Sequence, residues 1–189
     1  MIDPLVRYLQ SFRPIDVPDS ELILNAFQRK CLKEGDYLLE RDHICRELYF
    51  IRKGVAKIIR YNDKGGPVIY FFSKENQFCT ILHSFNTETP AEEEIRAACD
   101  LELSAISKAR LQSLYKLLPY LKDVIDQATQ QRLLDKVRIR NAYLGLDASD
   151  RYRLFLSIEP DVATRVSMTD MAAYLGVTPQ SLSRIRRKG

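Results

Sequence analysis

The sequence is short of the residues from which metal and redox sites are built. It has two histidines, four cysteines and no tryptophan among 189 residues. None of the histidines or cysteines falls at the close spacing of a zinc or iron–sulfur motif: they are His43, His83, Cys31, Cys45, Cys79 and Cys99. We therefore expect no metal and no cofactor, and we expect the thiols to be structural.

Long apolar runs are missing as well. The start, MIDPLVRYLQSF, lacks the features of a secretory signal, and apolar stretches such as Val68–Phe72 are far shorter than the roughly 20 residues that cross a bilayer. We therefore expect a cytoplasmic protein that has no membrane contact. A glycine-rich phosphate loop and a nucleophile–base pair are also absent, so the sequence predicts no enzyme, and catalysis is the least favoured alternative.

The net charge of +4 is unevenly distributed along the chain. Residues 136–189 carry ten lysines and arginines against five acidic residues, whereas residues 1–135 are close to neutral. The last twelve residues, TPQSLSRIRRKG, contain four basic side chains and no acid. A neutral body with a basic end suits a nucleic-acid phosphate backbone. A basic terminus can also be simply solvated, so the pattern around it has to decide.

The first 107 residues read as short helices followed by a β-rich domain. Residues 4–29 have helical spacing, and from residue 31 onward short apolar runs alternate with turn residues. Runs 55–61 and 68–72 flank the turn 62–67 and predict a hairpin. The α+β class with an antiparallel β-roll or jelly roll follows from many short strands. The expected strands are Tyr37–Leu39, Leu48–Ile51, Val55–Tyr61, Val68–Phe72, Ile95–Ala98 and Leu101–Ile106.

Helical spacing returns after residue 107. Residues 108–118 predict one helix, and Pro119 begins a long helix to about Leu146. The apolar stripe of the long helix includes Leu121, Val124, Ile125 and Ala128. It could pack on the chain's own roll, but we favour pairing with a second copy, because a helix between two domains has no evident core of its own. The expected domains are a sensor roll (1–118), a dimerisation helix (119–146) and a DNA-binding domain (147–189).

The segment VSMTDMAAYLGVTPQSLSRIRRKG has the pattern of a helix-turn-helix. Ser167 can cap a first helix, and Gly176 allows a sharp turn after it. Thr178 and Pro179 suit the start of a second helix, with Leu182 facing inward. The outward face of that helix is rich in arginine and free of acid, which is typical of a helix that reads the major groove.

We therefore expect this second helix to bind double-stranded DNA. Gln180 and Arg184 are expected to contact base edges, because an amide and a guanidinium match the hydrogen-bonding edges of bases. Ser181 and Ser183 are expected to contact bases or backbone. The complete set of candidates is Thr178, Gln180, Ser181, Ser183, Arg184, Arg186, Arg187 and Lys188, with Thr178 and Arg186 assigned to phosphates.

Two separate stretches resemble the Crp–Fnr family of transcription regulators. AAYLGVTPQSLSRIR is similar to the family pattern A-x-x-L-G-[VIT]-[ST]-x-x-[ST]-[LV]-[ST]-R-[IL], and LLERDHICRELYFIRKGVAKI resembles the first signature of its cyclic-nucleotide domain. The resemblance implies a sensor β-roll, a long dimer helix and a C-terminal (winged) helix-turn-helix. It further implies a homodimer that recognises a two-fold DNA site, with RNA polymerase as a partner.

The loop that binds cyclic nucleotides in this family departs from its pattern here. Asp42-His43 stand where the signature has a glycine and a small polar residue, and Ala91-Glu92 stand in place of the Arg-Ser/Thr pair that the family uses for the cyclic phosphate. Three consecutive glutamates, residues 92–94, would repel a phosphate. We therefore expect that standard cyclic-nucleotide binding is lost. The alternative is a cyclic-nucleotide-responsive regulator with non-standard phosphate contacts.

Any remaining sensor pocket is expected to be apolar or simply filled with side chains. Its candidate lining, if the strands pair as predicted, is Tyr49, Ile58, Tyr70, Phe72 and Phe78.

Overall fold

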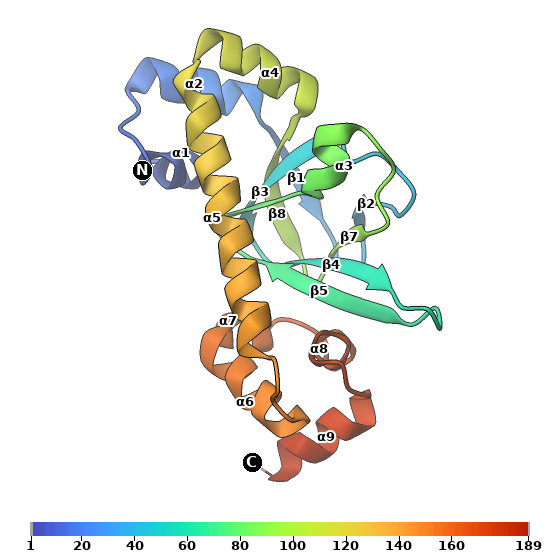
Figure 1. Ribbon diagram of the computed structural model, residues 1–189. Coiled ribbons are helices and arrows are strands. Elements are labelled where there is room, and N and C mark those ends of the chain that lie inside the picture. The colour runs from blue at the N-terminus through green and yellow to red at the C-terminus, as the bar shows by residue number, and fades with distance from the viewer. Residues whose placement is uncertain (1, 189) are drawn as a thin grey trace.

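The structure is a computed structural model that describes residues 2–188. Its strands form two antiparallel four-stranded sheets, ordered β1-β8-β3-β6 and β2-β7-β4-β5, which face each other as a β-roll (Figure 1). The expected α+β class with an antiparallel roll is confirmed. The strands are β1 (Gln28–Leu32), β2 (Tyr37–Leu39), β3 (Glu47–Lys53), β4 (Ala56–Tyr61), β5 (Pro67–Ser73), β6 (Gln77–Cys79), β7 (Glu94–Ala97) and β8 (Leu101–Ser107).

The predicted hairpin is the antiparallel pair β4–β5, in which Lys57 lies opposite Phe72. All six predicted runs overlap observed strands, but the pattern did not predict β1 and β6. Both lie at an edge of their sheet. The β1 sequence, QRKCL, has little apolar alternation and becomes a strand by pairing with β8. Residues 28 and 29, which we expected in the helical segment, therefore belong to a strand.

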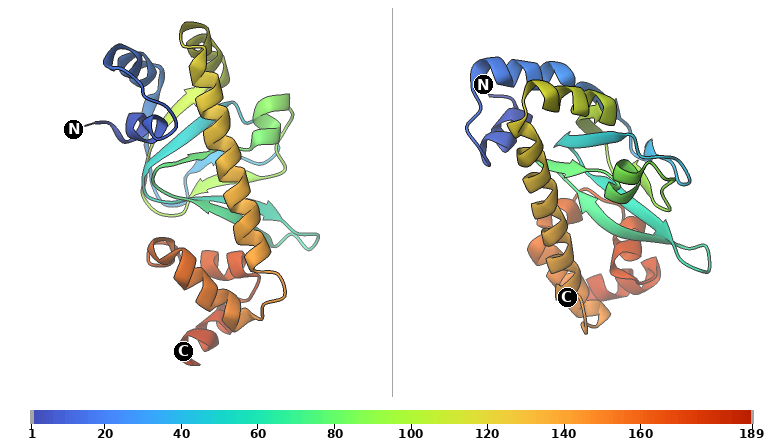
Figure 2. Two further views of the ribbon diagram at one scale, coloured as in Figure 1. Left: turned by 60° about the vertical axis from the view of Figure 1, so that its left-hand side comes forward. Right: turned by 45° about the horizontal axis from the view of Figure 1, so that its top comes forward.

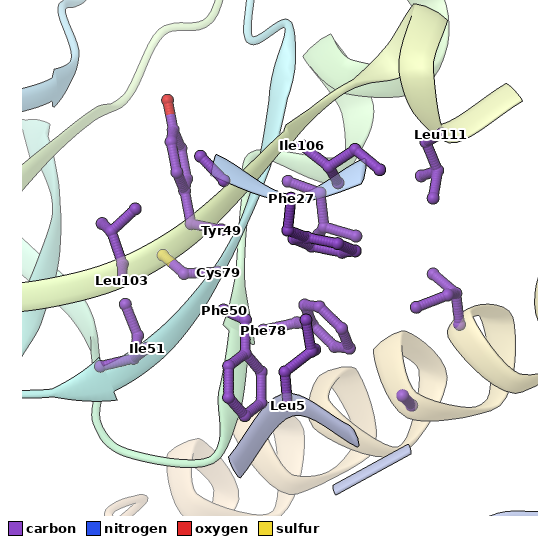
Figure 3. Close-up of a cluster of buried hydrophobic side chains, with 14 of the residues drawn as sticks. Leu5, Phe27, Tyr49, Phe50, Ile51, Phe78, Cys79, Leu103, Ile106 and Leu111 are labelled. Atoms are coloured by element: carbon purple, nitrogen blue, oxygen red, sulfur yellow. The ribbon is translucent and has the colours of Figure 1, made fainter. Parts of the chain in front are cut away.

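Four helices cover the roll: α1 (Pro4–Gln10), α2 (Val17–Ala26), α3 (Leu82–Thr87) and α4 (Lys108–Leu117). The core beneath them is aromatic and aliphatic, as Figure 3 shows for Leu5, Phe50 and Phe78. The Phe50 and Phe78 rings meet edge to face with centroids 5.4 Å apart, a favourable geometry for aromatic pairs. Side chains from both sheets and from α1 therefore fill this part of the roll.

The long helix, α5 (Tyr120–Ala142), runs beside the roll and connects it to the C-terminal helices (Figures 1 and 2). Leu121, Val124, Ile125 and Ala128 are at most 3% exposed and belong to the same core as Leu5 and Phe50. The expectation that these four residues meet a second copy is wrong. The roll and its N-terminal helices supply the core that the sequence pattern could not reveal.

The C-terminal part is helical and docks against the β4–β5 side of the roll (Figure 1). Its helices are α6 (Ala148–Ile158), α7 (Pro160–Ala163), α8 (Met168–Leu175) and α9 (Pro179–Lys188). A second hydrophobic core joins both parts, and in it Phe72 of β5 packs against both Phe155 and Tyr174 at ring-centroid distances of 6.3 and 5.1 Å. This core crosses the domain boundary that we expected near residue 147.

The expected wing is not present among residues 147–188, which contain no strand. The segment between α7 and α8, residues 164–167, is too short for a hairpin, so the described C-terminal part is a helix-turn-helix on a helical support. Helix α5 also ends four residues before the expected Leu146, at Ala142, and the connection to α6 includes Gly145 with φ of 76°.

Candidate nucleic-acid interface

The helix-turn-helix is built by capping groups at both of its helices. Ser167 Oγ accepts a hydrogen bond from the Asp170 N–H at 3.0 Å, which satisfies the open N-terminus of α8. Gly176 ends α8 in the left-handed region, with φ of 68° and ψ of 37°. Thr178 Oγ1 then accepts from the Ser181 N–H at 3.1 Å at the start of α9. The predicted caps and turn are therefore present.

The outer face of α9 brings together a subset of the predicted DNA-binding residues. Leu182 is fully buried and holds α9 against the support, whereas Gln180, Arg184 and Arg187 are exposed. Gln180, Ser183, Arg184 and Arg187 together line one shallow concave surface, as their spacing of three and four residues requires. This surface carries two guanidiniums, one amide and one hydroxyl, and no carboxylate.

The remaining predicted residues lie around that surface. Thr178 and Ser181 sit at the N-terminus of α9, with their hydroxyl oxygens 3.0 Å apart. Arg186 is on the flank toward α8, with Nη1 3.4 Å from the sulfur of Met168. The side chain of Lys188 lies outside the described residues. The predicted residues therefore fall into two groups on α9. The surface formed by residues 180, 183, 184 and 187 is central, with Thr178 and Ser181 at the N-terminal end of the helix and Arg186 on its flank.

Ion pairs of three roll residues, Lys57, Lys74 and Glu75, tie the helix-turn-helix and its support to the roll, a feature that the sequence did not indicate. The shortest approaches are 2.7 Å for Lys57–Asp170, 2.6 Å for Arg165–Glu75 and 2.9 Å for Lys74–Glu159. Lys57 and Asp170 are only 13% and 12% exposed as side chains. Because Asp170 lies in the first turn of α8, the roll holds the first helix of the motif directly.

Protonation of these pairs follows from their contacts. Partial burial alone would raise the pKa of Glu75, but hydrogen bonds from Arg165 and from the Gly54 N–H stabilise its carboxylate and lower the pKa below the ordinary value. Partial burial alone would lower the pKa of Lys74, but hydrogen bonds to Glu159 and Asp161 raise it. Glu75 is therefore ionised and Lys74 is therefore protonated near neutral pH.

In the roll, the loop that resembles the phosphate-binding segment is closed by its own contacts. The Ala91 N–H donates to the His43 carbonyl at 2.9 Å, and its carbonyl accepts from the Asp42 N–H at 2.8 Å. Glu92 pairs with Arg60. Glu94 is 4% exposed and receives Arg96 Nη2 at 2.7 Å. Arg96, the nearby base, is therefore already paired with a carboxylate.

The five residues that we expected to line a sensor pocket do not come together. Tyr49, Ile58 and Phe78 are buried in the first core, with the Tyr49 hydroxyl donating to the Leu38 carbonyl at 2.7 Å. Phe72 belongs to the second core. Tyr70 is half-buried beside Arg140, whose guanidinium carbon lies 5.1 Å from the ring centroid. The split arises because the buried apolar side chains of β5, Ile69 and Phe72, both belong to the second core, whereas those of β3 and β6 belong to the first.

Two cations of α5 occupy the space between this helix and β5. Arg132 Nη2 donates to the Phe72 carbonyl at 2.8 Å, and the Lys136 ammonium lies 4.9 Å from the centroid of the Phe71 ring. Burial lowers the pKa of both groups. Because these side chains fill the gap, they also connect α5 to the strand that carries Phe72.

The apolar side chains on the second half of α5 are exposed, whereas those on the first half are buried. Leu133, Leu134 and Val137 are 50%, 59% and 48% exposed. Beside them, a groove of about 540 Å³ runs between α5 and the helices α3 and α4, with Ile125 and Leu133 in its wall. The sequence did contain a signal for these residues, since Leu133, Leu134 and Val137 continue the apolar stripe beyond Gln131. No helix among residues 2–188 is long and apolar enough to traverse a bilayer.

One known protein family resembles part of the chain. Residues 29–117 match the family model of the cyclic nucleotide-binding domain. No curated protein sequence matches the chain.

Solved structures of transcription regulators share the fold of this chain. The c-di-GMP-responsive global regulator CLP of Xanthomonas campestris superposes with a TM-score of 0.71 and 22% identity, over 92% of this chain and 91% of that one. The catabolite activator protein of Thermus thermophilus gives 0.58 and 17%, over 96% and 85%. A Crp–Fnr regulator from Eubacterium rectale gives 0.69 and 15%, over 96% and 87%. The chain therefore shares the fold of these proteins, and its residues 29–117 resemble a cyclic nucleotide-binding domain.

Proposed function

We propose that the protein is a sequence-specific DNA-binding regulator of transcription that acts in the cytoplasm as a homodimer. Residues 1–118 form its sensor roll, 119–146 the dimerisation helix, and 147–189 the part that binds DNA. The observation that carries the proposal is the acid-free outer face of α9, where Gln180, Ser183, Arg184 and Arg187 share one exposed surface. RNA polymerase is the further partner that regulation of transcription requires.

On this proposal the central surface reads bases and its surroundings hold phosphates. Gln180 and Arg184 have the amide and the guanidinium that pair with adenine and guanine edges in the major groove. Thr178, Ser181 and Arg186, at the edges of the surface, then contact the backbone. Two copies would place half-sites about one helical turn, or ~34 Å, apart.

The test begins with selection of bound sequences from a random duplex pool by the purified full chain, which should enrich a two-fold site. On that site Arg184→Ala should cost about 1–3 kcal/mol and relax the preference at one base position. Arg186→Ala should weaken binding to all sequences and reduce the salt slope by about one unit. Lys116→Ala is the matched control, because Lys116 is an exposed residue of α4, which lies at the end of the molecule opposite α9 (Figure 1). Equal losses on selected and random DNA for Arg184→Ala would contradict base reading.

The dimer is proposed along the second half of α5 rather than along the buried first half. Leu133, Leu134 and Val137 expose apolar area that a second α5 could bury, and the neighbouring groove leaves room for it. Light scattering at micromolar concentration should give twice the mass of one chain. A monomer under these conditions would contradict this part of the proposal.

We further propose that the roll has lost standard cyclic-nucleotide binding. A buried cyclic phosphate needs a guanidinium and backbone N–H donors, but the Ala91 N–H is already bonded and Arg96 is paired with Glu94. Calorimetry with cyclic AMP at about millimolar concentration should show no binding at the roll. A micromolar dissociation constant, abolished by substitutions in the loop 88–93, would favour the alternative of non-standard phosphate contacts.

A further inference from the structure

Arg132 and Lys136 lie one helical turn apart on the side of α5 that passes the roll (Figure 1). Both line a small cavity of about 30 Å³ between α5 and β6, together with Thr80 and Thr129. By its volume the cavity holds roughly two water-sized groups. It adjoins the larger groove beside α3 and α4, because Thr80 and Thr129 line both, so a small molecule can reach it from solvent.

Neither cation is in contact with a carboxylate among the described residues. The Lys136 ammonium lies 4.9 Å from the centroid of the Phe71 ring, and no residue among 2–188 forms a hydrogen bond or an ion pair with it. Arg132 donates through Nη2 to the Phe72 carbonyl, but its Nε is buried and has no hydrogen-bond partner in this part of the chain. Two positive charges therefore lie near each other where little water screens them, and a negative group between them would be stabilised.

The Lys136 side chain is the nucleophilic group of this cluster. Burial and the charge of Arg132 lower the pKa of its ammonium, so a larger fraction is present as the neutral amine than in an exposed lysine. The other titratable group that faces it is the Cys79 thiol of β6, whose pKa is raised by burial, so that it is uncharged near neutral pH. A desolvated amine next to another cation is the environment that activates lysine as a nucleophile.

We propose that Lys136 reacts reversibly with carbon dioxide, and that the cavity and Arg132 hold the carbamate that forms. The Nζ lone pair forms a bond to the carbon of carbon dioxide, one C=O π pair moves onto an oxygen, and the nitrogen releases a proton to water. The ammonium has already lost one proton to water to become the amine. The product carries a carboxylate-like group in place of the positive charge, and its oxygens can accept hydrogen bonds from the Arg132 guanidinium. Repulsion between two cations thereby becomes attraction.

Chemical trapping on the full chain without DNA tests the site, so the result does not depend on whether the protein binds DNA. The protein is equilibrated at about pH 8, where exposed lysines are protonated, with or without isotopically labelled bicarbonate and dissolved carbon dioxide. Triethyloxonium then converts carbamates to stable ethyl esters, and peptide mass spectrometry locates them. The labelled ester is expected at Lys136.

Lys122 is the internal control for this labelling. It lies on the same helix but is 61% exposed, and its hydrogen bond to Asp126 raises its pKa. Lys136 should carry at least about tenfold more label, because each unit of pKa difference changes the fraction of neutral amine about tenfold.

Variants then test the surroundings of the carbamate. Arg132→Gln removes the guanidinium that holds it and should lower the labelling by about tenfold or more. Arg140→Gln, at an exposed position about two turns further along α5, is the matched control and should leave the labelling unchanged. Thr129→Leu, at a half-buried position, should fill the cavity and prevent labelling while both cations stay, so it tests the site even if Arg132→Gln does not fold. Absence of label at Lys136, equal label at Lys122, or undiminished labelling in folded Arg132→Gln or in Thr129→Leu would each overturn the proposal.

Discussion

Lys57 and Asp170 should be strongly coupled: removal of either partner alone should be costly, whereas replacement of both by apolar residues should cost little. Lys57 Nζ lies 2.7 and 2.8 Å from the two carboxylate oxygens of Asp170. The side chains are 13% and 12% exposed, so little water is available to either charge. Removal of one partner from such a pair leaves an uncompensated buried charge, which costs about 3–5 kcal/mol.

A double-mutant cycle isolates that interaction. Lys57→Met and Asp170→Leu should each lower the free energy of unfolding by about 3 kcal/mol, whereas the double variant should be close to the parent because two apolar groups replace two charges. For a chain of this length the single variants should melt about 6–12 °C lower. The measurement is urea unfolding followed by circular dichroism, since the sequence has no tryptophan.

Lys33→Met is the control for the loss of an exposed ion pair. Its partner is Asp100, and the two side chains are 80% and 68% exposed, so the loss of stability should be far smaller than for either buried partner. If the double variant loses the sum of the two single losses, the pair has no coupling energy, and the roll does not hold α8 through this contact.

Three other predictions follow from the same structure. The carboxylate of Glu75 has a pKa below its ordinary 4.5. Its contribution to stability is therefore present above pH 4.5 and falls as the pH drops through the lowered pKa. Glu75→Gln should make the melting temperature less dependent on pH between about pH 6 and pH 3. Gly54 has φ of 95°, and a Cβ there would lie 2.3 Å from the Asp100 carbonyl oxygen. Gly54→Ala should therefore lower the free energy of unfolding, measured in urea, by about 3 kcal/mol. A loss below about 1 kcal/mol would contradict this close contact. Val137→Asp should give a folded monomer in light scattering. Ala128→Asp, at a fully buried position, should instead disrupt the fold itself. A folded monomer from Ala128→Asp would favour a dimer face on the first half of α5, as we expected from the sequence.

Local capping and turn chemistry made the helix-turn-helix predictable from sequence. Ser167, Gly176 and Thr178 act through neighbours at most four residues away in the chain, so their roles do not depend on the rest of the fold. The alternation of apolar residues likewise predicted the hairpin, because both strands of a pair turn one face inward. Helix α9 exposes the predicted residues for the same local reason.

Contacts between distant segments could not be predicted in this way. Lys57 and Asp170 are 113 residues apart, and each is an ordinary charged residue in its own local pattern. Phe72 alternates as expected for a roll interior, but it packs on Phe155 in the second core. The strand period shows that a side chain is buried, but not which core receives it.

The long helix shows why burial and partner are separate questions. Its apolar spacing runs from Leu121 to Val137 with a break at Gln131–Arg132, but the spacing alone does not show that the residues before the break pack on the chain's own roll. The boundary falls near Arg132, where the guanidinium binds the Phe72 carbonyl and the helix leaves the first core. Because Phe72 itself packs on Phe155, a shift of α5 relative to β5 would have to break either that hydrogen bond or the second core. Arg132, near which the exposed apolar surface of α5 begins, is therefore also the residue that links the long helix to the second core.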